Sequence, residues 1–193
     1  ELLLFGKPVI TETLNGLSYE ISAKSFFQTN TLQAERLYQT VQRMAGEHPQ
    51  GVAVDLYCGT GAIALHLAPQ FQTVYGVELV AEAVLNAQQN AARNNLTNVS
   101  FHCGEVQKVL PDLFQTVPDV MVIDPPRAGL SKKVVREILT TAPRQIIYVS
   151  CNPATLARDV AMFTEGGFEI LEVQPIDMFP HTYHIETVVN LMK

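Results

Sequence analysis

At 193 residues, of which 47% are hydrophobic, the chain is long enough to bury one core and too short for several large domains. It has no apolar run that would span a bilayer and no secretory leader, and its three cysteines lack disulfide or metal-ligand spacing, so we expect a soluble, cytoplasmic protein without a metal site. The net charge of −6 argues against a free-standing nucleic-acid-binding domain, which usually carries a basic excess, and a monomer is the simplest expectation.

The first predicted element is a β-hairpin. Apolar residues alternate with polar ones on both sides of Asn15-Gly16, a pair that supplies the positive φ angles of a tight turn. Residues 30–45 then carry apolar side chains at helical spacing and end at Gly46. The sequence therefore predicts a hairpin extension over residues 1–28, followed from residue 29 to 193 by one domain that opens with an amphipathic helix.

From Val52 onward, apolar runs alternate with helical patterns. The expected strands are 52–57, 73–79, 99–103, 120–124 and 145–150. Four helices are expected between or after them: one that ends near Leu67, one that runs through Asn94, and two that cover 131–141 and 153–163. This alternation predicts a parallel sheet with helices on both faces. The last two apolar runs, 168–179 and 184–192, have no helix between them and should pair antiparallel at one edge of that sheet.

A glycine-rich turn follows the first of these strands. Gly59 and Gly61 in the motif DLYCGTGA allow a tight turn and let a ligand approach the backbone at a helix N-terminus. Glu78, which closes the next strand, is placed to accept hydrogen bonds from ribose hydroxyls. This pair indicates an adenosine-containing cofactor, although the same glycines with Ala64 also fit the GxGxxA pattern of dinucleotide binders.

Two further strands end in acidic residues. Glu105 follows the third strand and would reach an adenine amino group, or it is a solvated acid at a helix start. The fourth strand ends in Asp124, two prolines and Arg127, a rigid arrangement that recurs in methyltransferases acting on planar nucleobases. A purely structural turn is the alternative for this motif.

Cys151 lies where the fifth strand ends and a helix begins. The positive end of the helix dipole favours a thiolate there, which is the environment of a nucleophile. The competing interpretation is an inert core cysteine, as expected for Cys58 in the glycine turn and Cys103 in a strand.

Four motifs occur in order, namely DLYCGTGAIAL, IDPPRAGL, VSCNPATLARD and FPHTYHIETV. Together they resemble the RNA 5-methyluridine methyltransferase family, which acts on uracil C5, over the chain from about Phe26 onward. The resemblance implies a doubly wound, seven-stranded Rossmann-like α/β sheet of order 3-2-1-4-5-7-6 with an antiparallel last strand. It also implies S-adenosylmethionine as the cofactor and ribosomal or transfer RNA as the substrate.

The resemblance assigns roles to individual residues. It implies that Cys151 is the nucleophile and Glu186 the general base. It places the cofactor at Gln28, Tyr57, Glu78 and Asp124, and at Glu105, a site that varies in residue type, while Gly59 and Gly61 join them from the glycine-rich turn.

The expected chemistry explains why these residue types are needed. A Cys151 thiolate adds to uracil C6, which makes C5 nucleophilic, and Glu186 later removes the C5 proton. Charge that develops at O4 needs a hydrogen-bond donor, for which Arg127, Asn152, backbone amides and His181 are candidates.

Three alternatives stay open at this point. Methylation of an exocyclic amine would use the acid-Pro-Pro motif without Cys151 or Glu186, a nucleotide-binding dehydrogenase would use only the glycine turn, and an inactive cofactor-binding module would need none of these groups. Because the chain starts at Glu1 and lacks the RNA-binding barrel usual in the family, we expect an excised catalytic domain whose RNA-gripping parts are missing.

Overall fold

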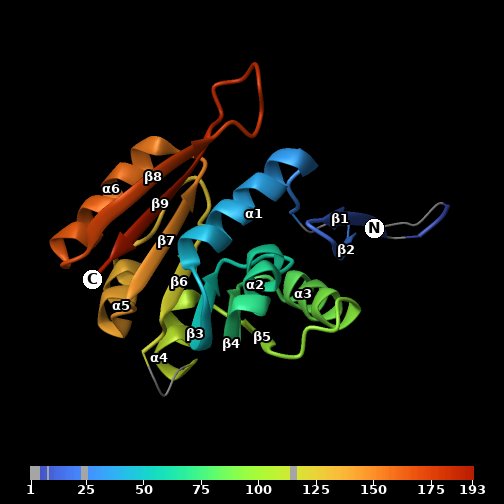
Figure 1. Cartoon of the computed structure of the whole chain (residues 1–193), viewed down its shortest axis with the longest axis horizontal. Coiled ribbons are helices and arrows are strands. Elements are labelled where there is room, and N and C mark those ends of the chain that lie inside the picture. Colours follow the sequence, from blue (N-terminus) through green and yellow to red (C-terminus); the bar gives the residue numbers. More distant parts are fainter. Residues whose placement is uncertain (1–4, 8, 23–25, 114–116) are drawn as a thin grey trace.

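The computed structural model of the protein describes residues 5–7, 9–22, 26–113 and 117–193 (Figure 1). Its large sheet contains β3 (His48–Leu56), β4 (Phe71–Glu78), β5 (Val99–Cys103), β6 (Val120–Ile123), β7 (Gln145–Ser150), β8 (Glu169–Ile176) and β9 (Glu186–Met192). The helices are α1 (Thr31–Ala45), α2 (Ala62–Leu67), the short 3₁₀ helix η1 (Ala68–Gln70), α3 (Ala81–Arg93), α4 (Val106–Leu113), α5 (Lys132–Thr141) and α6 (Pro153–Glu165).

The sheet has the predicted topology. Its strands lie in the order β5-β4-β3-β6-β7-β9-β8. Counted from β3, this order is 3-2-1-4-5-7-6, because the hairpin strands take the first two labels. The pairs from β5 to β7 are parallel, whereas β9 is antiparallel to both β7 and β8. The doubly wound α/β fold expected from the sequence is therefore confirmed.

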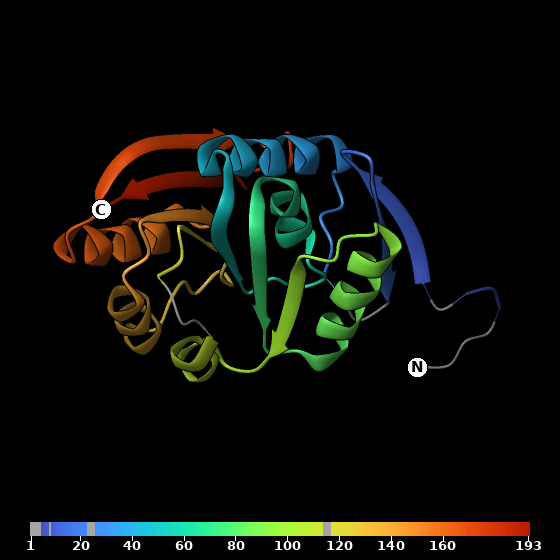
Figure 2. The same cartoon turned by 60° about the horizontal axis from the view of Figure 1, so that its bottom comes forward.

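Two helical layers sandwich this sheet (Figure 2). One hydrophobic cluster includes buried residues of α1, α2 and α3 with one face of the strands, and a second cluster includes those of α4, α5 and α6 with the other face. Because both faces are covered, β6 and β7 are buried along their whole length, as their continuous apolar sequence requires.

The N-terminal hairpin consists of β1 (Val9–Leu14) and β2 (Leu17–Ser22) and packs on α3. Asn15 and Gly16 have φ angles of 48° and 82°, the double positive turn that this dipeptide predicts. Asn90 of α3 and Asn94, which caps the C-terminus of this helix, hydrogen-bond the backbone of β2, with Asn90 Oδ1 accepting from Glu20 N at 2.8 Å. Residues 1–4, 8 and 23–25 of the predicted extension lie outside the described residues.

Some boundaries differ from the prediction. β3 begins at His48 rather than Val52, because a register shift lets the strand continue past polar residues and Gly51. Helix α4 was given no range from the sequence, since it is short and carries an internal Pro111. Within the described ranges, no helix is long and apolar enough to cross a membrane.

Candidate active site

The candidate site lies at one edge of the large sheet. The carboxyl ends of β3 to β7 meet there, followed by the residues that the sequence analysis singled out. Strand β9 runs the opposite way, so its first residue, Glu186, reaches the same edge. The topology thus gathers the candidate residues from widely separated parts of the chain.

The turn between β3 and α2 is built from unusual backbone conformations. Tyr57, Gly59 and Gly61 have φ angles of 65°, 53° and 84°. A side chain on Gly61 would come within 2.8 Å of the Phe101 ring, so glycine is required there by space as well as by φ. A left-handed non-glycine residue such as Tyr57 costs free energy and often marks a functional site.

Glu78 supports this turn. Its Oε2 accepts a hydrogen bond from Gly59 N at 3.1 Å, and its Oε1 accepts one from Val80 N at 2.9 Å. Each carboxylate oxygen has further lone pairs, so Glu78 can still accept hydrogen bonds from a ligand.

A small pocket next to the turn contains several of the predicted cofactor residues. Its lining consists of Phe26, Phe27, Gln28, Tyr38, Asp55, Tyr57, Cys58, Gly59, Thr60, Ala62, Ile63 and Asp124. Asp55 is fully buried, and its Oδ2 accepts a hydrogen bond from Ala64 N at 2.9 Å. Its Oδ1 has no hydrogen-bond partner among the described residues, which is rare for a buried carboxylate oxygen. The pocket therefore offers an unsatisfied acceptor to a ligand that carries N–H groups.

Glu105 is placed differently from the other predicted cofactor residues. It immediately precedes α4, and its carboxylate pairs with Lys108 Nζ at 2.5 Å and accepts a hydrogen bond from Gln107 Nε2 at 2.5 Å. This geometry fits the alternative of an acid at a helix start, so the adenine-binding role of Glu105 stays a prediction.

The segment from Ser150 to Pro153 explains why Cys151 is held at the edge. Asn152 caps α6, with Oδ1 accepting from Ala154 N at 3.0 Å, and Pro153 occupies the first helical position. Ser150 Oγ accepts a hydrogen bond from Asn152 N at 3.1 Å. Cys151 is thus fixed between a buried strand and a capped helix, and its side chain is partly exposed.

Strand pairing brings Glu186 to Cys151. In the antiparallel β7–β9 ladder, Ser150 lies opposite Thr187, so the residues next to this pair, Cys151 and Glu186, are neighbours. The Glu186 side chain is only 8% exposed. The structure therefore places the predicted nucleophile and the predicted base together.

The carboxyl groups of the site have raised pKa values. Burial raises the pKa of Glu186 from its ordinary 4.5 to about 7, although nearby Arg127 opposes the shift. Burial and the charge of Glu186 raise the pKa of Asp124 from 3.8 to about 7. A base with a pKa near neutrality is suited to accept and release a proton at physiological pH.

The expectation that the surroundings of Cys151 favour a thiolate is not supported for the free protein. Partial burial, followed by the charge of Glu186, raises the pKa of Cys151 above its ordinary value. A hydrogen bond and the positive charge from Arg127 act in the opposite direction. Arg127 is therefore the group on which thiolate formation depends.

A buried network holds the loop that carries Arg127. The fully buried Asp159 accepts hydrogen bonds through Oδ2 from Leu130 N and from Tyr148 Oη, both at 2.7 Å. The Arg127 carbonyl accepts hydrogen bonds from Asn152 Nδ2 and from Thr155 Oγ1, each at 3.2 Å. The loop after β6 and the start of α6 thus form one unit, which fixes Arg127 relative to Cys151.

Sequence reasoning missed part of this site. The sequence pattern places Tyr38 only on the apolar face of a helix, yet it lines the pocket, and burial, followed by the charges of nearby acids such as Asp124, raises its pKa. The unsatisfied oxygen of Asp55 was also missed, although its position at the head of the glycine motif was an available signal. Asn152 was a candidate donor, but its side chain is already engaged by Ala154 N and the Arg127 carbonyl.

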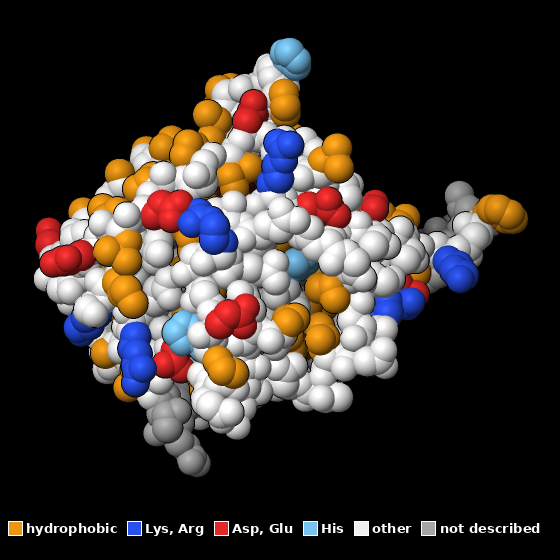
Figure 3. All heavy atoms as spheres, viewed as in Figure 1, with side chains coloured by type: hydrophobic (Ala, Val, Ile, Leu, Met, Phe, Trp, Pro, Cys, Tyr) orange, Lys and Arg blue, Asp and Glu red, His pale blue; other side chains and the backbone are white. Residues whose placement is uncertain are grey.

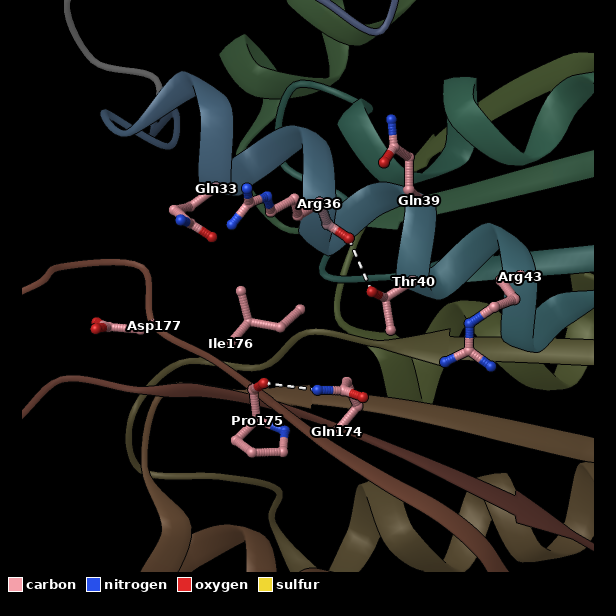
Figure 4. A pocket seen from close by; sticks show the side chains of 9 residues that line it. All are labelled: Gln33, Arg36, Gln39, Thr40, Arg43, Gln174, Pro175, Ile176 and Asp177. Carbon is pink, nitrogen blue, oxygen red and sulfur yellow. Dashed lines mark hydrogen bonds between the residues drawn. The ribbon is translucent and has the colours of Figure 1, made fainter.

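A second hollow lies between α1 and β8 (Figure 4). It has a volume of about 510 Å³, and polar residues line most of it, including Gln33, Arg36 and Asp177. None of the predicted site residues is among those that line it, so it does not compete with the edge of the sheet as the candidate site.

Comparisons with known proteins show the family to which the chain belongs. Residues 47–176 match the family described as "Methyltransferase domain". An uncharacterized RNA methyltransferase of Enterococcus faecalis is 48% identical over 194 aligned residues, which cover 100% of this chain and 42% of that protein. An uncharacterized RNA methyltransferase of Caldanaerobacter subterraneus is also 48% identical, over 99% of this chain and 42% of that protein. The chain therefore spans less than half the length of these relatives.

A solved structure with a described substrate is also similar. The tRNA (uracil-54, C5)-methyltransferase of Pyrococcus abyssi, in complex with S-adenosyl-L-homocysteine, superposes with a TM-score of 0.85 at 35% identity. The match covers 97% of this chain and 45% of that one.

The raised pKa of Glu186 predicts a pH-dependent stability difference. Because the folded-state pKa is above the unfolded one, the stability that protonated Glu186 contributes is full below about pH 4.5 and is lost as the pH rises through about 7. Relative to wild type, Glu186→Gln should therefore become more stable by about 2 kcal/mol between about pH 5 and about pH 8, as measured by urea unfolding.

Glu172→Gln is the matched control, since Arg43 lowers the pKa of the Glu172 carboxyl and moves its titration below this window. A Glu186→Gln difference that is the same at both pH values would contradict the assignment.

Proposed function

Because this chain belongs to the methyltransferase domain family, we propose that it transfers a methyl group from S-adenosylmethionine to C5 of a uracil in RNA, through a temporary bond between Cys151 and C6 of the base. The observation that carries the proposal is the β7–β9 pairing, which sets Glu186 beside Cys151. Covalent activation of uracil needs both groups, whereas direct methylation of an amine needs neither.

The residues of the pocket fit the cofactor. S-adenosylmethionine supplies an electrophilic methyl group when it is bound. The buried Asp55 Oδ1, which lacks a partner, suits an ammonium or amide N–H, and the turn at Gly59 and Gly61 leaves the backbone accessible. We assign Gln28, Tyr57, Glu78 and Asp124 to cofactor binding as well, and Glu105 only as the remaining candidate.

Cys151 begins the reaction on the RNA. Its thiolate forms a bond to C6 of the uracil, and the electron pair of the C5–C6 double bond moves towards O4, which leaves C5 nucleophilic. Arg127 stabilises the thiolate before attack. Among the donors considered for O4, we favour Arg127, because the Asn152 side chain is engaged in holding the loop.

Glu186 completes the reaction. The C5 electron pair forms a bond to the methyl carbon while the bond from that carbon to the sulfonium sulfur breaks and leaves its electrons on sulfur, after which C5 still carries its original hydrogen. The Glu186 carboxylate takes this proton, the electrons of the C5–H bond re-form the C5–C6 double bond, and the bond to Cys151 breaks to release the thiolate. The acids that line the pocket, Asp55 and Asp124, are assigned to the cofactor, so Glu186 is the carboxylate left for this step.

The similarities support RNA as the substrate and do not choose between ribosomal and transfer RNA. Relatives of 48% identity are described as RNA methyltransferases, and the Pyrococcus abyssi enzyme acts on a tRNA uracil. Membership of the methyltransferase family decides against the dehydrogenase alternative. Amine methylation is the second candidate, since the acid-Pro-Pro motif is common to both reactions.

A trapping experiment tests the proposal. RNA transcribed with 5-fluorouridine in place of uridine should form a methylated covalent adduct with the natural full-length protein, because Glu186 cannot remove fluorine from C5. The adduct should appear as a slow band in denaturing electrophoresis and as protein plus methylated RNA in mass spectrometry. Cys151→Ala should abolish it, whereas Cys103→Ala, which changes an exposed cysteine outside the pocket lining, should leave it intact. RNA methylation without an adduct, equally fast in Cys151→Ala, would instead establish the amine reaction.

Replacement of Glu186 separates the two halves of the reaction. With ordinary uridine RNA, Glu186→Gln should accumulate the methylated adduct, because the C5 proton stays in place and the thiolate is not expelled. Turnover should fall by about 100-fold or more, the usual contribution of a positioned base. Denaturing electrophoresis over time measures the adduct, with Glu172→Gln as the control. Wild-type turnover by Glu186→Gln would remove Glu186 from the mechanism.

A further inference from the structure

The loop of residues 177–185, between β8 and β9, projects from the edge of the sheet that carries the site (Figure 1). Histidine and hydrophobic side chains gather on this projection (Figure 3). Tyr183 is 88% exposed, which is unusual for an aromatic side chain of this size. It lies three positions before Glu186, so an exposed ring stands in the segment that leads into the proposed general base.

The loop is anchored at its base and bonded within itself. Met178 is fully buried, and its carbonyl accepts a hydrogen bond from Asn30 Nδ2 at 2.8 Å. Thr182 Oγ1 donates to the Phe179 carbonyl at 2.7 Å and accepts a hydrogen bond from His184 N at 3.1 Å. These bonds flank Tyr183 on both sides, so its backbone is held although its ring is exposed.

Contacts connect the Tyr183 ring to the nucleophile. Its centroid lies 4.2 Å from that of the His184 ring, with 40° between the two planes. His184 Nδ1 lies 3.5 Å from Arg127 Nη2. Arg127 in turn acts on Cys151, since its positive charge opposes the rise in the pKa of that thiol. A nucleic-acid strand whose target base reaches Cys151 would therefore bring an adjoining nucleotide to this loop.

The charge of the domain favours base stacking over phosphate contacts as the way in which this loop would hold an RNA strand. The net charge is −6, and the Lys and Arg side chains visible in Figure 3 are scattered among acidic ones rather than gathered in a patch. Stacking of a base on an aromatic ring requires no counterion release and works with every base. Tyrosine has few rotatable bonds, so little side-chain freedom is lost when a base packs on it.

We propose that Tyr183, supported by His184, is a stacking platform for the nucleobase that adjoins the target uracil in the RNA. The inference rests on the proposed function and adds a binding subsite to it. The platform would hold the strand in register once the target base has left its stack, a step that costs a few kcal/mol on its own.

The experiment combines a protein change with an RNA change. Short RNAs with one central 5-fluorouridine are prepared with normal nucleotides or with an abasic nucleotide at either adjoining position. The rate of covalent capture by the natural full-length protein is measured at subsaturating RNA for wild type, Tyr183→Ala and Tyr183→Phe. Phe5→Ala, which removes an equally exposed ring from the far N-terminal end of the chain, is the matched control.

On normal RNA, Tyr183→Ala should slow capture by about tenfold, the effect of losing one base–aromatic stack, while Tyr183→Phe and Phe5→Ala stay near wild type. The abasic nucleotide should slow wild type by a similar factor at one adjoining position and have little further effect on Tyr183→Ala, since both changes remove the same contact.

The two proposals fail in different ways. If wild type forms no adduct, the proposed function is contradicted. If wild type forms the adduct and Tyr183→Ala captures RNA equally fast, or if the alanine and abasic effects multiply at both positions, the platform is contradicted and the proposed function stands.

Discussion

The antiparallel pairing of β9 with β7 is the constraint on which the candidate site depends. A parallel sheet brings together only residues that follow its strands, which accounts for Asp124 and Cys151. Glu186 precedes its strand, and it reaches the same edge only because β9 enters the sheet in the opposite direction. The reversal also makes the β8–β9 connection end beside Cys151, so the exposed loop with Tyr183 and the buried Glu186 are positioned by one topological feature.

The electrostatics of the site follow from where these groups are buried. Asp55, Asp124 and Glu186 all have raised pKa values, because burial removes water from each carboxylate and, for Asp55 and Asp124, because other acids lie nearby. The same conditions raise the pKa of Cys151, and Arg127 is the positive group that opposes them. Its loop is fixed by the buried Asp159, so a polar network inside the second hydrophobic layer supports the chemistry at the surface. In this arrangement protonation of Glu186 and ionisation of Cys151 favour each other.

Much of this organisation was predictable from the sequence. The Asn15-Gly16 turn, the alternation of buried strands with helices and the strand-end positions of Gly59, Asp124 and Cys151 depend on local patterns, which the chain displays directly. The position of Glu186 beside Cys151 came from the family resemblance, because strand register is a long-range property. The pKa of Cys151 was not predictable, since it depends on the balance between Glu186 and Arg127 across three strands. The role of Tyr38 was also hidden, because a tyrosine on the apolar face of a helix has the same pattern whether it lines a pocket or only packs.

The central claim is that the methyl group replaces the hydrogen on uracil C5 after Cys151 has added to C6. Release of tritium into water from RNA labelled at C5 of its uracils measures this replacement directly, alongside transfer of methyl groups from S-adenosylmethionine. One tritium should be released for each methyl group transferred at labelled sites, and both release and transfer should be lost in Cys151→Ala. Methyl transfer that releases no tritium would contradict it and place the methyl group on another atom of the RNA.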